Sequence, residues 1–354
     1  MKHSIIRLMA LILTITLLLG LMAGCGKTGS AGDGADVVYV PTYEQFPGEY
    51  RYMGSACVSG DTLYFSADVT DPEDVPPEDA DEYYYPNTIT KLFKMDLPTR
   101  EVSELSDYTP LDIPAEYDAM ENVEGRFYMN NIFVDGDGSL WVNESGWFSR
   151  FDFPEGITYE TADDPYQYYQ DLGSVSVLRN LDATGKELGS LDLTAFVGKD
   201  TYIQTVAVDA AGNIYLTDGS TFVNVVGSDG SVICELPISN WVDGFVPLND
   251  GTMAAIGYWD SGMEIRPIDL SAKNFKDNVG PNRDFDSYSI YPASGEYDFL
   301  YTSGDNLFAH KSGSEDVKLL SWINCDISTD SLSAVIPRED GVILCVTATW
   351  DDTS

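Results

Sequence analysis

Two stretches of this 354-residue chain combine aromatic rings with carboxylates in a pattern that suits ligand contact. The first, residues 71–85, is an acidic run that ends in three tyrosines, and the second, residues 153–173, alternates tyrosines with Glu160, Asp163 and Asp164. A ring offers an apolar face, and the phenol and carboxylate offer hydrogen bonds, so a sugar or the basic side chains of a peptide could bind. The alternative is that the rings fold back and cover sheet edges. The candidate ligand contacts are Trp141, Trp147, Tyr159, Tyr166, Tyr168 and Tyr169.

The segment Val134–Glu144 superficially resembles a calcium-binding loop, because Asp135 and Asp137 fall at its first and third ligand positions. The pattern then fails. Leu140 stands where the loop needs glycine, and Gly146 stands where it needs a bidentate glutamate. A hairpin turn explains the same residues, since Asp and Gly tolerate positive φ. We therefore expect no metal site and no cofactor here; calcium stays open as loose binding to the acidic run and as part of the hydrolase alternative given below.

Histidine and cysteine give little support for catalysis. After the first 24 residues the chain has one histidine, His310, in an outer-strand pattern that predicts a surface position. Cys57, Cys234, Cys325 and Cys345 form no C-x-x-C pair, so zinc lacks its usual ligand sets. We expect these cysteines to be unpaired thiols that act as small hydrophobes, with disulfides as the alternative. The chain is accordingly predicted not to be an enzyme.

One strand-turn-strand pattern, clearest at Thr205–Leu216 (T-V-A-V-D-A-A-G-N-I-Y-L), recurs along the chain. From Gly212 onward its turn glycines recur about every 40 to 50 residues, which is typical of propeller blades. The third unit predicts four strands, at 203–209, 213–217, 221–227 and 231–236. The other copies lie at 56–65, 132–142, 245–256, 291–301 and 334–346.

These repeats predict an all-β fold, a β-propeller of about six visible four-stranded blades with the last blade incomplete. Insertions after the second strand, at 71–86 and 153–173, should emerge on the same rim. The sixth unit offers two strands and then stops at Ser354. Because Val37–Pro41 could supply one outer strand but not two, we expect the chain to be truncated or to be the first module of a longer protein.

The first residues are typical of an export signal. Residues 1–24 combine a positive head, an apolar run shorter than the ~20 residues of a spanning helix and a small-residue end. Cys25 follows Ala-Gly as in a lipobox, which predicts acylation of Cys25 and anchoring to the outer face of a bacterial membrane. Residues 25–36 then form a flexible tether, and 37–354 the propeller.

The charge balance excludes one class of partner. Removing the signal leaves 17 of the 19 basic residues against 58 acidic residues, a formal charge of −41. Nucleic-acid binding needs basic surfaces that displace phosphate counterions, so no nucleic-acid partner is expected. Such a charge suits an extracytoplasmic protein that charge keeps soluble.

The lipobox, the V-Y-V-P segment, and blades built on D-G-S-L-W-V and G-D-T-L-Y-F turns carry a family resemblance. Together they resemble the propeller-like N-terminal module of clostridial-type (Gram-positive) lipoproteins of the extracellular ABC solute-binding class. The resemblance covers 37–354 and implies a C-terminal solute-binding domain or an ABC permease as the partner. No part of this sequence looks like that domain, so the resemblance places the transport-related site beyond Ser354.

The sequence thus favours a lipid-anchored, non-catalytic recognition or scaffold module that is linked to the capture of a carbohydrate or peptide solute. A calcium-dependent propeller hydrolase or lactonase is the first alternative, and it would need several carboxylates that converge at one mouth of the channel. A structural spacer is the second alternative, and it would need no ligand site.

Overall fold

The computed structural model describes residues 47, 50, 52–72, 74, 87–117, 120–159, 161–197, 203–238, 241–260, 262–281, 285, 289–321, 332–338 and 342–347. The chain divides into two compact units, Met1–Val40 and Pro41–Ser354, and every described residue belongs to the second. No helix within these ranges is long and apolar enough to cross a membrane. Cys25, Cys325 and most of the acidic run after Thr70 lie outside the described residues.

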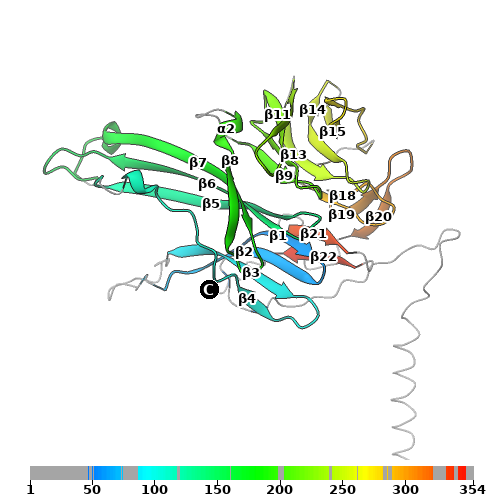
Figure 1. The fold of residues 1–354 in the computed structure, drawn as a ribbon, viewed down its shortest axis with the longest axis horizontal. Coiled ribbons are helices and arrows are strands. Elements are labelled where there is room, and N and C mark those ends of the chain that lie inside the picture. Colours follow the sequence, from blue (N-terminus) through cyan, green and yellow to red (C-terminus); the bar gives the residue numbers. More distant parts are fainter. Residues whose placement is uncertain are drawn as a thin grey trace, which may run out of the picture. The chain divides into compact units, whose positions relative to one another are not determined.

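The described residues form five antiparallel four-stranded sheets and one two-stranded sheet (Figure 1). Blade 1 contains β1 (Tyr52–Ser59), β2 (Thr62–Thr70), β3 (Thr88–Asp96) and β4 (Val102–Glu104). Blade 2 contains β5 (Val123–Val134), β6 (Leu140–Phe151), β7 (Tyr169–Leu181) and β8 (Glu187–Asp192). Blade 3 contains β9 (Thr205–Val208), β10 (Ile214–Thr217), β11 (Phe222–Val226) and β12 (Val232–Pro237).

Blades 4 and 5 repeat this meander. Blade 4 contains β13 (Trp241–Pro247), β14 (Met253–Trp259), β15 (Gly262–Asp269) and β16 (Asn274–Phe275). Blade 5 contains β17 (Ile290–Pro292), β18 (Phe299–Ser303), β19 (Asn306–His310) and β20 (Val317–Ser321). The two-stranded sheet pairs β21 (Leu332–Pro337) with β22 (Ile343–Thr347). The described helices are short, namely η1 (Ala115–Tyr117), η2 (Pro165–Tyr168) and α2 (Thr194–Val197).

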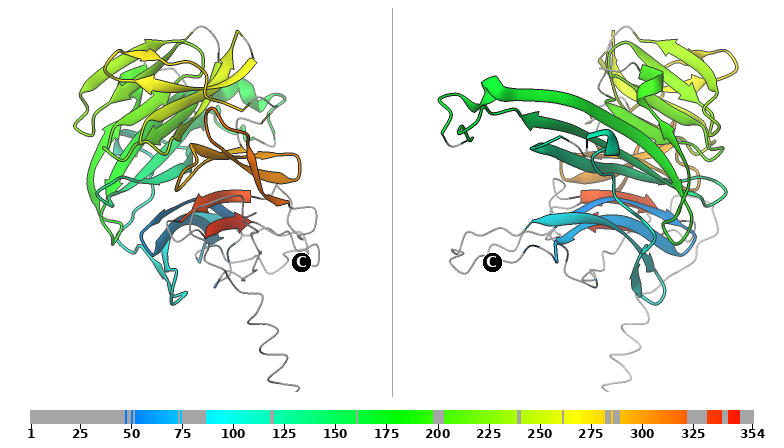
Figure 2. Two further views of the ribbon diagram at one scale, coloured as in Figure 1. Left: turned by 90° about the vertical axis from the view of Figure 1, so that its right-hand side faces the viewer. Right: turned by 60° about the vertical axis from the view of Figure 1, so that its left-hand side comes forward.

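The first strands of the six sheets form a ring. Strands β1, β5, β9, β13, β17 and β21 contact one another in that order, and β21 contacts β1 again. Figure 2 shows the sheets arranged in this succession. The prediction of an all-β propeller is confirmed, but the described residues form five four-stranded blades where about six were expected, together with a sixth sheet of two strands.

Burial on both faces of the sheets explains why the strands are so apolar. All four residues of β10 are buried, because neighbouring blades cover the two faces of the blade 3 sheet. On one side Val225 of blade 3 belongs to the same buried cluster as Val242 and Met253 of blade 4. The four strands that the sequence predicted for the third unit are confirmed to within two residues at their ends.

A repeated aspartate fixes the turn between the first two strands of a blade. In blade 3 Asp209 accepts hydrogen bonds from the N–H groups of Ala211 and Asn213, at 2.9 and 2.8 Å, and from the Tyr215 hydroxyl at 3.0 Å. Burial, followed by the charge of Asp209, raises the pKa of Tyr215, so this phenol remains a donor. In the corresponding turn of blade 2, Asp135 accepts from the backbone of Ser139. The hairpin interpretation of the calcium-like segment is therefore confirmed.

Contacts between these turns tie neighbouring blades together at one end of the ring. Gly136 donates its N–H to the Ala210 carbonyl at 3.0 Å, which joins blades 2 and 3. The Arg338 guanidinium pairs with Asp61 at 2.8 Å, which joins the last sheet to the first. The ring is therefore closed by an ion pair as well as by the contact of β21 with β1.

Candidate functional site on the second blade

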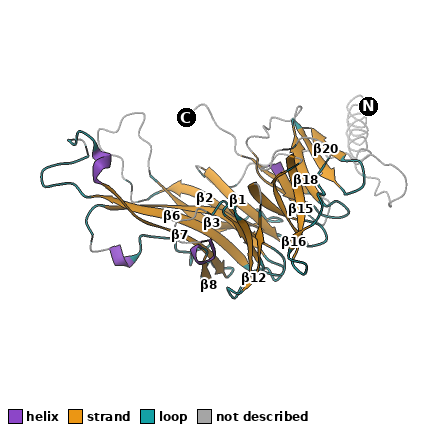
Figure 3. Cartoon of the chain, turned by 90° about the horizontal axis from the view of Figure 1, so that it is seen from above, coloured by secondary structure: helices purple, strands orange, loops and turns teal. Residues whose placement is uncertain are grey.

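Blade 2 differs from the other blades in the length of three strands. Strands β5, β6 and β7 span 12, 12 and 13 residues, whereas β8 spans 6 and pairs with β7 only from Val177 to Leu181. Their distal halves therefore project as a three-stranded ribbon (Figure 3). The sequence analysis placed an insertion at 153–173, and the structure shows that its last part continues β7.

One face of the ribbon is covered by the link between blades 1 and 2. The Tyr117 ring of that link lies 4.8 Å from the Phe148 ring, and its hydroxyl donates to the Leu172 carbonyl at 3.1 Å. Gly125 and Gly146 have no room for a Cβ, because the Phe127 ring lies directly over both. This face is a small extension of the core.

The opposite face carries exposed aromatic rings. Tyr128 of β5 and Trp147 of β6 stack with ring centroids 5.4 Å apart and an interplanar angle of 28°. They remain 46% and 42% exposed. Ser174 of β7 lies directly beside Trp147 in the register. Because Ser174 is small, the Trp147 ring stands free on the side toward β7.

The distal end of the same face carries a second group of rings, centred on Phe151. Phe151 lies four residues beyond Trp147 on β6, so both point to the same face of the strand. Its ring contacts Phe153 at 5.5 Å, Tyr159 at 5.4 Å and Tyr169 at 5.6 Å. We define the aromatic stripe as Tyr128, Trp147, Phe151, Tyr159, Tyr166 and Tyr169.

The structure sorts the six aromatic candidates. Trp147, Tyr159, Tyr166 and Tyr169 belong to the stripe and are exposed, with Tyr166 the most open at 67%. Tyr168 is half-buried and packs against Phe153 with ring centroids 5.4 Å apart. Tyr128 and Phe151 complete the stripe and were missed by the sequence analysis.

Trp141 lies elsewhere. It is 4% exposed, and its indole N–H donates to Asp135 at 2.9 Å. It therefore occupies the position that Tyr215 holds in blade 3, six residues after the turn aspartate. A buried ring of this kind supports the blade and offers no surface to a ligand, so the proposed ligand contact at Trp141 does not fit the structure.

Charged groups around the stripe are mainly acidic. The guanidinium groups are those of Arg126 and Arg150, and Arg150 already pairs with Asp152 at 3.2 Å and with Gln170 at 2.8 Å. Asp164 accepts from the Tyr166 N–H at the start of η2, which orders the loop that carries Tyr166. The exposed carboxylates of the ribbon are Glu124, Asp152, Glu155, Asp163, Asp164 and Asp171.

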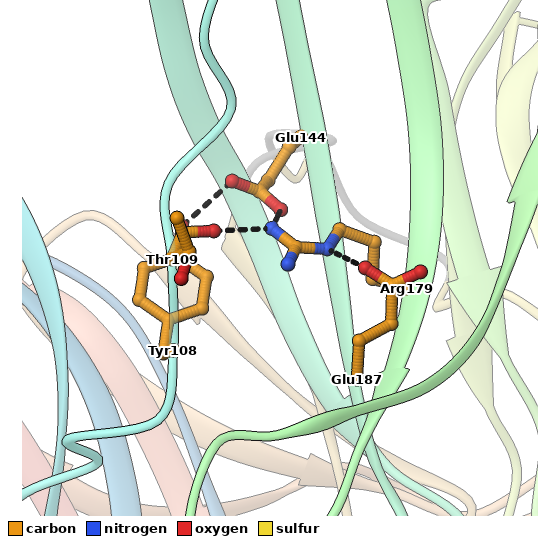
Figure 4. Close-up of polar contacts among 5 residues, drawn as sticks. All are labelled: Tyr108, Thr109, Glu144, Arg179 and Glu187. Carbon is orange, nitrogen blue, oxygen red and sulfur yellow. Dashed lines mark hydrogen bonds and ion pairs between the residues drawn. The ribbon is translucent and has the colours of Figure 1, made fainter.

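A buried ion-pair network lies at the base of the ribbon (Figure 4). Arg179 of β7 donates to Glu144 of β6 at 2.9 Å, to Glu187 of β8 at 2.7 Å and to the Thr109 carbonyl at 2.7 Å. The Tyr108 hydroxyl donates to the second oxygen of Glu144 at 2.6 Å. Glu144 and Arg179 are 3% and 8% exposed, so this network clamps the link between blades 1 and 2 onto the ribbon.

The charges of this network favour a structural role over ligand binding. Burial alone would lower the pKa of Arg179, but the two glutamates outweigh that effect and raise it. Burial, followed by the Glu144 charge, raises the pKa of Tyr108, so the phenol stays protonated. A shallow cleft of about 240 Å³ borders Arg179. Because two carboxylates neutralise this guanidinium, the cleft does not favour an anionic ligand.

His310 is not the surface residue that its sequence context predicted. It is 5% exposed, its Nδ1 lies 2.6 Å from Asp316, and its Nε2 lies 2.8 Å from the Val279 carbonyl. The Phe299 ring stacks on it at 4.7 Å. The prediction was wrong because both ring nitrogens have buried partners: Asp316, six residues along the chain, and the carbonyl of Val279, 31 residues away in the link between blades 4 and 5.

The described cysteines and carboxylates add no further site. Cys57, Cys234 and Cys345 are free thiols. Within the described ranges, no three His, Cys, Asp or Glu side chains gather closely enough to hold a metal ion. The turn carboxylates of Asp135 and Asp209 instead accept hydrogen bonds from their own hairpins.

The chain matches no family model and no curated protein. Among solved structures it is similar to a glucose dehydrogenase, at 12% identity and a TM-score of 0.43, over 87% of this chain and 97% of that one. It is also similar to a catalytically inactive virginiamycin B lyase from Staphylococcus aureus with quinupristin, at 10% identity and a TM-score of 0.41, over 80% and 88%. The β-propeller domain of the Trilobed protease from Pyrococcus furiosus matches at 10% identity and a TM-score of 0.37, over 85% and 86%. At these scores the likenesses carry no argument about activity.

Proposed function

We propose that the chain is an extracytoplasmic β-propeller that recognises a ligand without transforming it. The exposed aromatic stripe on the projecting ribbon of blade 2 is the observation that carries this proposal. Rings that stand free on a rigid strand lose little side-chain freedom on binding, which favours them as contact residues. The solute would be a carbohydrate or a peptide, and its capture would serve an ABC importer.

The buried polar residues of the described blades are consistent with a structural role that supports the aromatic stripe. Both ring nitrogens of His310, a potential general base, already have partners in Asp316 and the Val279 carbonyl. Arg179 and Glu144 already pair with each other in the buried network at the base of the ribbon. Arg179 and Glu144 therefore support the ribbon that carries the stripe.

A binding experiment tests the proposal. The full-length chain is titrated with a panel of neutral oligosaccharides and short peptides, and each ligand is recovered and weighed by mass spectrometry. We expect one ligand class to bind, Trp147→Ala to weaken that binding, and the ligand to return unchanged. Tyr258→Ala is the matched control, because Tyr258 is an exposed aromatic residue of blade 4. Turnover of a ligand, or binding that ignores Trp147, would contradict the proposal.

The membrane anchor is tested separately through Cys25. The chain is expected to incorporate labelled palmitate and to sediment with membranes. Cys25→Ala should abolish the label and release the protein. Because the substitution leaves the propeller intact, binding by the released protein should be unchanged.

A further inference from the structure

The ribbon that carries the aromatic stripe also has an open strand edge. In the described part of the chain, no strand pairs with the outer side of Tyr169–Val175, since the pairing of β8 begins at Val177. A bulge between Phe148 and Ser149 bends the ribbon there. At the bulge the Leu172 carbonyl accepts from Tyr117 and the Gly173 N–H donates to Asp171, so the backbone on either side of these two groups is the template for a further strand. The bend limits the edge to short partners.

The negative charge of the ribbon favours a positively charged partner. Its exposed carboxylates outnumber its two guanidinium groups three to one, and Arg150 is already paired. The chain after the signal carries a formal charge of −41, so the wider field has the same sign. A cationic segment is therefore attracted, and an anionic one is repelled, before any close contact forms.

The rings next to this edge favour the same partner. Lysine and arginine side chains gain stability over the faces of Trp and Tyr rings. A strand added to β7 would lie about 5 Å from it and about 10 Å from β6. Ser174, between such a strand and Trp147, is too small to block a long side chain that reaches over it to the ring.

We infer that the stripe binds an extended polypeptide segment rich in lysine or arginine, which pairs with the open edge of β7 and lays its cationic side chains on Trp147. This inference rests on the proposed function and names its ligand class. A neutral sugar would use the rings, but it would use neither the unpaired backbone nor the excess of carboxylates.

The test uses the full-length chain and three probes. These are a twelve-residue peptide of alternating lysine and threonine, the same peptide with alternate backbone amides N-methylated, and a neutral glucose hexasaccharide. We expect the first peptide to bind and Trp147→Ala to weaken its affinity about twofold to fivefold, as the loss of an exposed cation–π contact predicts. Tyr258→Ala should leave the affinity unchanged. N-methylation should weaken binding about tenfold if backbone pairing contributes.

The outcomes separate this inference from the proposed function. If Trp147→Ala leaves the affinity for the peptide unchanged, the binding reflects only the negative charge of the whole chain, and the inference is overturned. Equal affinity for the N-methylated peptide would also overturn it, because the edge would then not be used. Trp147-dependent binding of the hexasaccharide alone would overturn the inference and leave the proposed function standing. Loss of Trp147-dependent binding for every probe and every member of the wider panel would overturn both.

Discussion

Replacing Arg179 with methionine is expected to destabilise the propeller more than any surface ion pair could. Methionine keeps much of the aliphatic volume but removes the guanidinium that pairs with Glu144 at 2.9 Å. Glu144 is only 3% exposed, so its charge would remain buried and would keep the hydrogen bond from the Tyr108 hydroxyl. Breaking a buried pair in this way costs about 3–5 kcal/mol. Urea unfolding at neutral pH, followed by Trp fluorescence, measures the loss.

The matched control is Lys91→Met. Lys91 pairs with Glu104 at 2.9 Å, but the two side chains are 31% and 43% exposed, so the loss should stay below about 1 kcal/mol. A second control separates charge from packing. In a Glu144→Gln background the buried charge is gone, so Arg179→Met should cost about 2 kcal/mol less than in the wild type. If Arg179→Met costs no more than Lys91→Met, the clamp is not a stabilising feature and the reasoning is refuted.

Three further substitutions test other parts of the molecule. Trp141→Phe removes the indole N–H that Asp135 accepts, so unfolding free energy should fall by about 1 kcal/mol while ligand binding stays at the wild-type level; weaker binding with unchanged stability would reverse the assignment of Trp141. His310→Phe should cost about 3 kcal/mol in the same unfolding assay, because the Val279 carbonyl loses the imidazole and Asp316 keeps the Tyr301 hydroxyl but loses the ring nitrogen; a neutral effect would contradict the buried network. Burial raises the pKa of the Cys345 thiol to about 11 from 9.0, so the folded state holds this proton more tightly than the unfolded state. Its contribution to stability is therefore complete below pH 9.0 and is lost as the pH rises toward about 11, and Cys345→Ala should reduce that loss in unfolding curves recorded across this range.

Much of the fold could be predicted because a propeller repeats one local pattern. The strands of the third unit were placed to within two residues, since the turn aspartate and glycine mark each hairpin. Aligning the repeats would also have assigned Trp141, because it falls six residues after Asp135 as Tyr215 falls after Asp209. The repeat thus indicates that Trp141 is a buried structural residue, although its acidic and aromatic neighbours suggested ligand contact.

The remainder of the site depends on register and on distant partners. Tyr128 becomes part of the stripe only because its strand pairs Arg126 with Trp147, which local sequence does not specify. Arg179 meets Glu144 across 35 residues of sequence. His310 is buried for the same reason, since Val279 supplies one of its acceptors from 31 residues away. Hydrogen-bond partners that are distant in sequence therefore determine where Arg179 and His310 lie, and the periodicity of the local sequence does not reveal such partners.

The closure of the ring has a consequence for the order of folding. Each blade is a meander whose strands are neighbours in sequence, so its hairpins can form as soon as the segment is available. The ion pair between Asp61 and Arg338, by contrast, spans 277 residues. The open side of the first blade is therefore covered only after β21 has formed. Until then this blade exposes the apolar surface against which Ile336 and Leu344 pack in the folded protein. We expect the last slow folding phase to report this closure, and the first blade to be the part of the propeller most in need of protection until it ends.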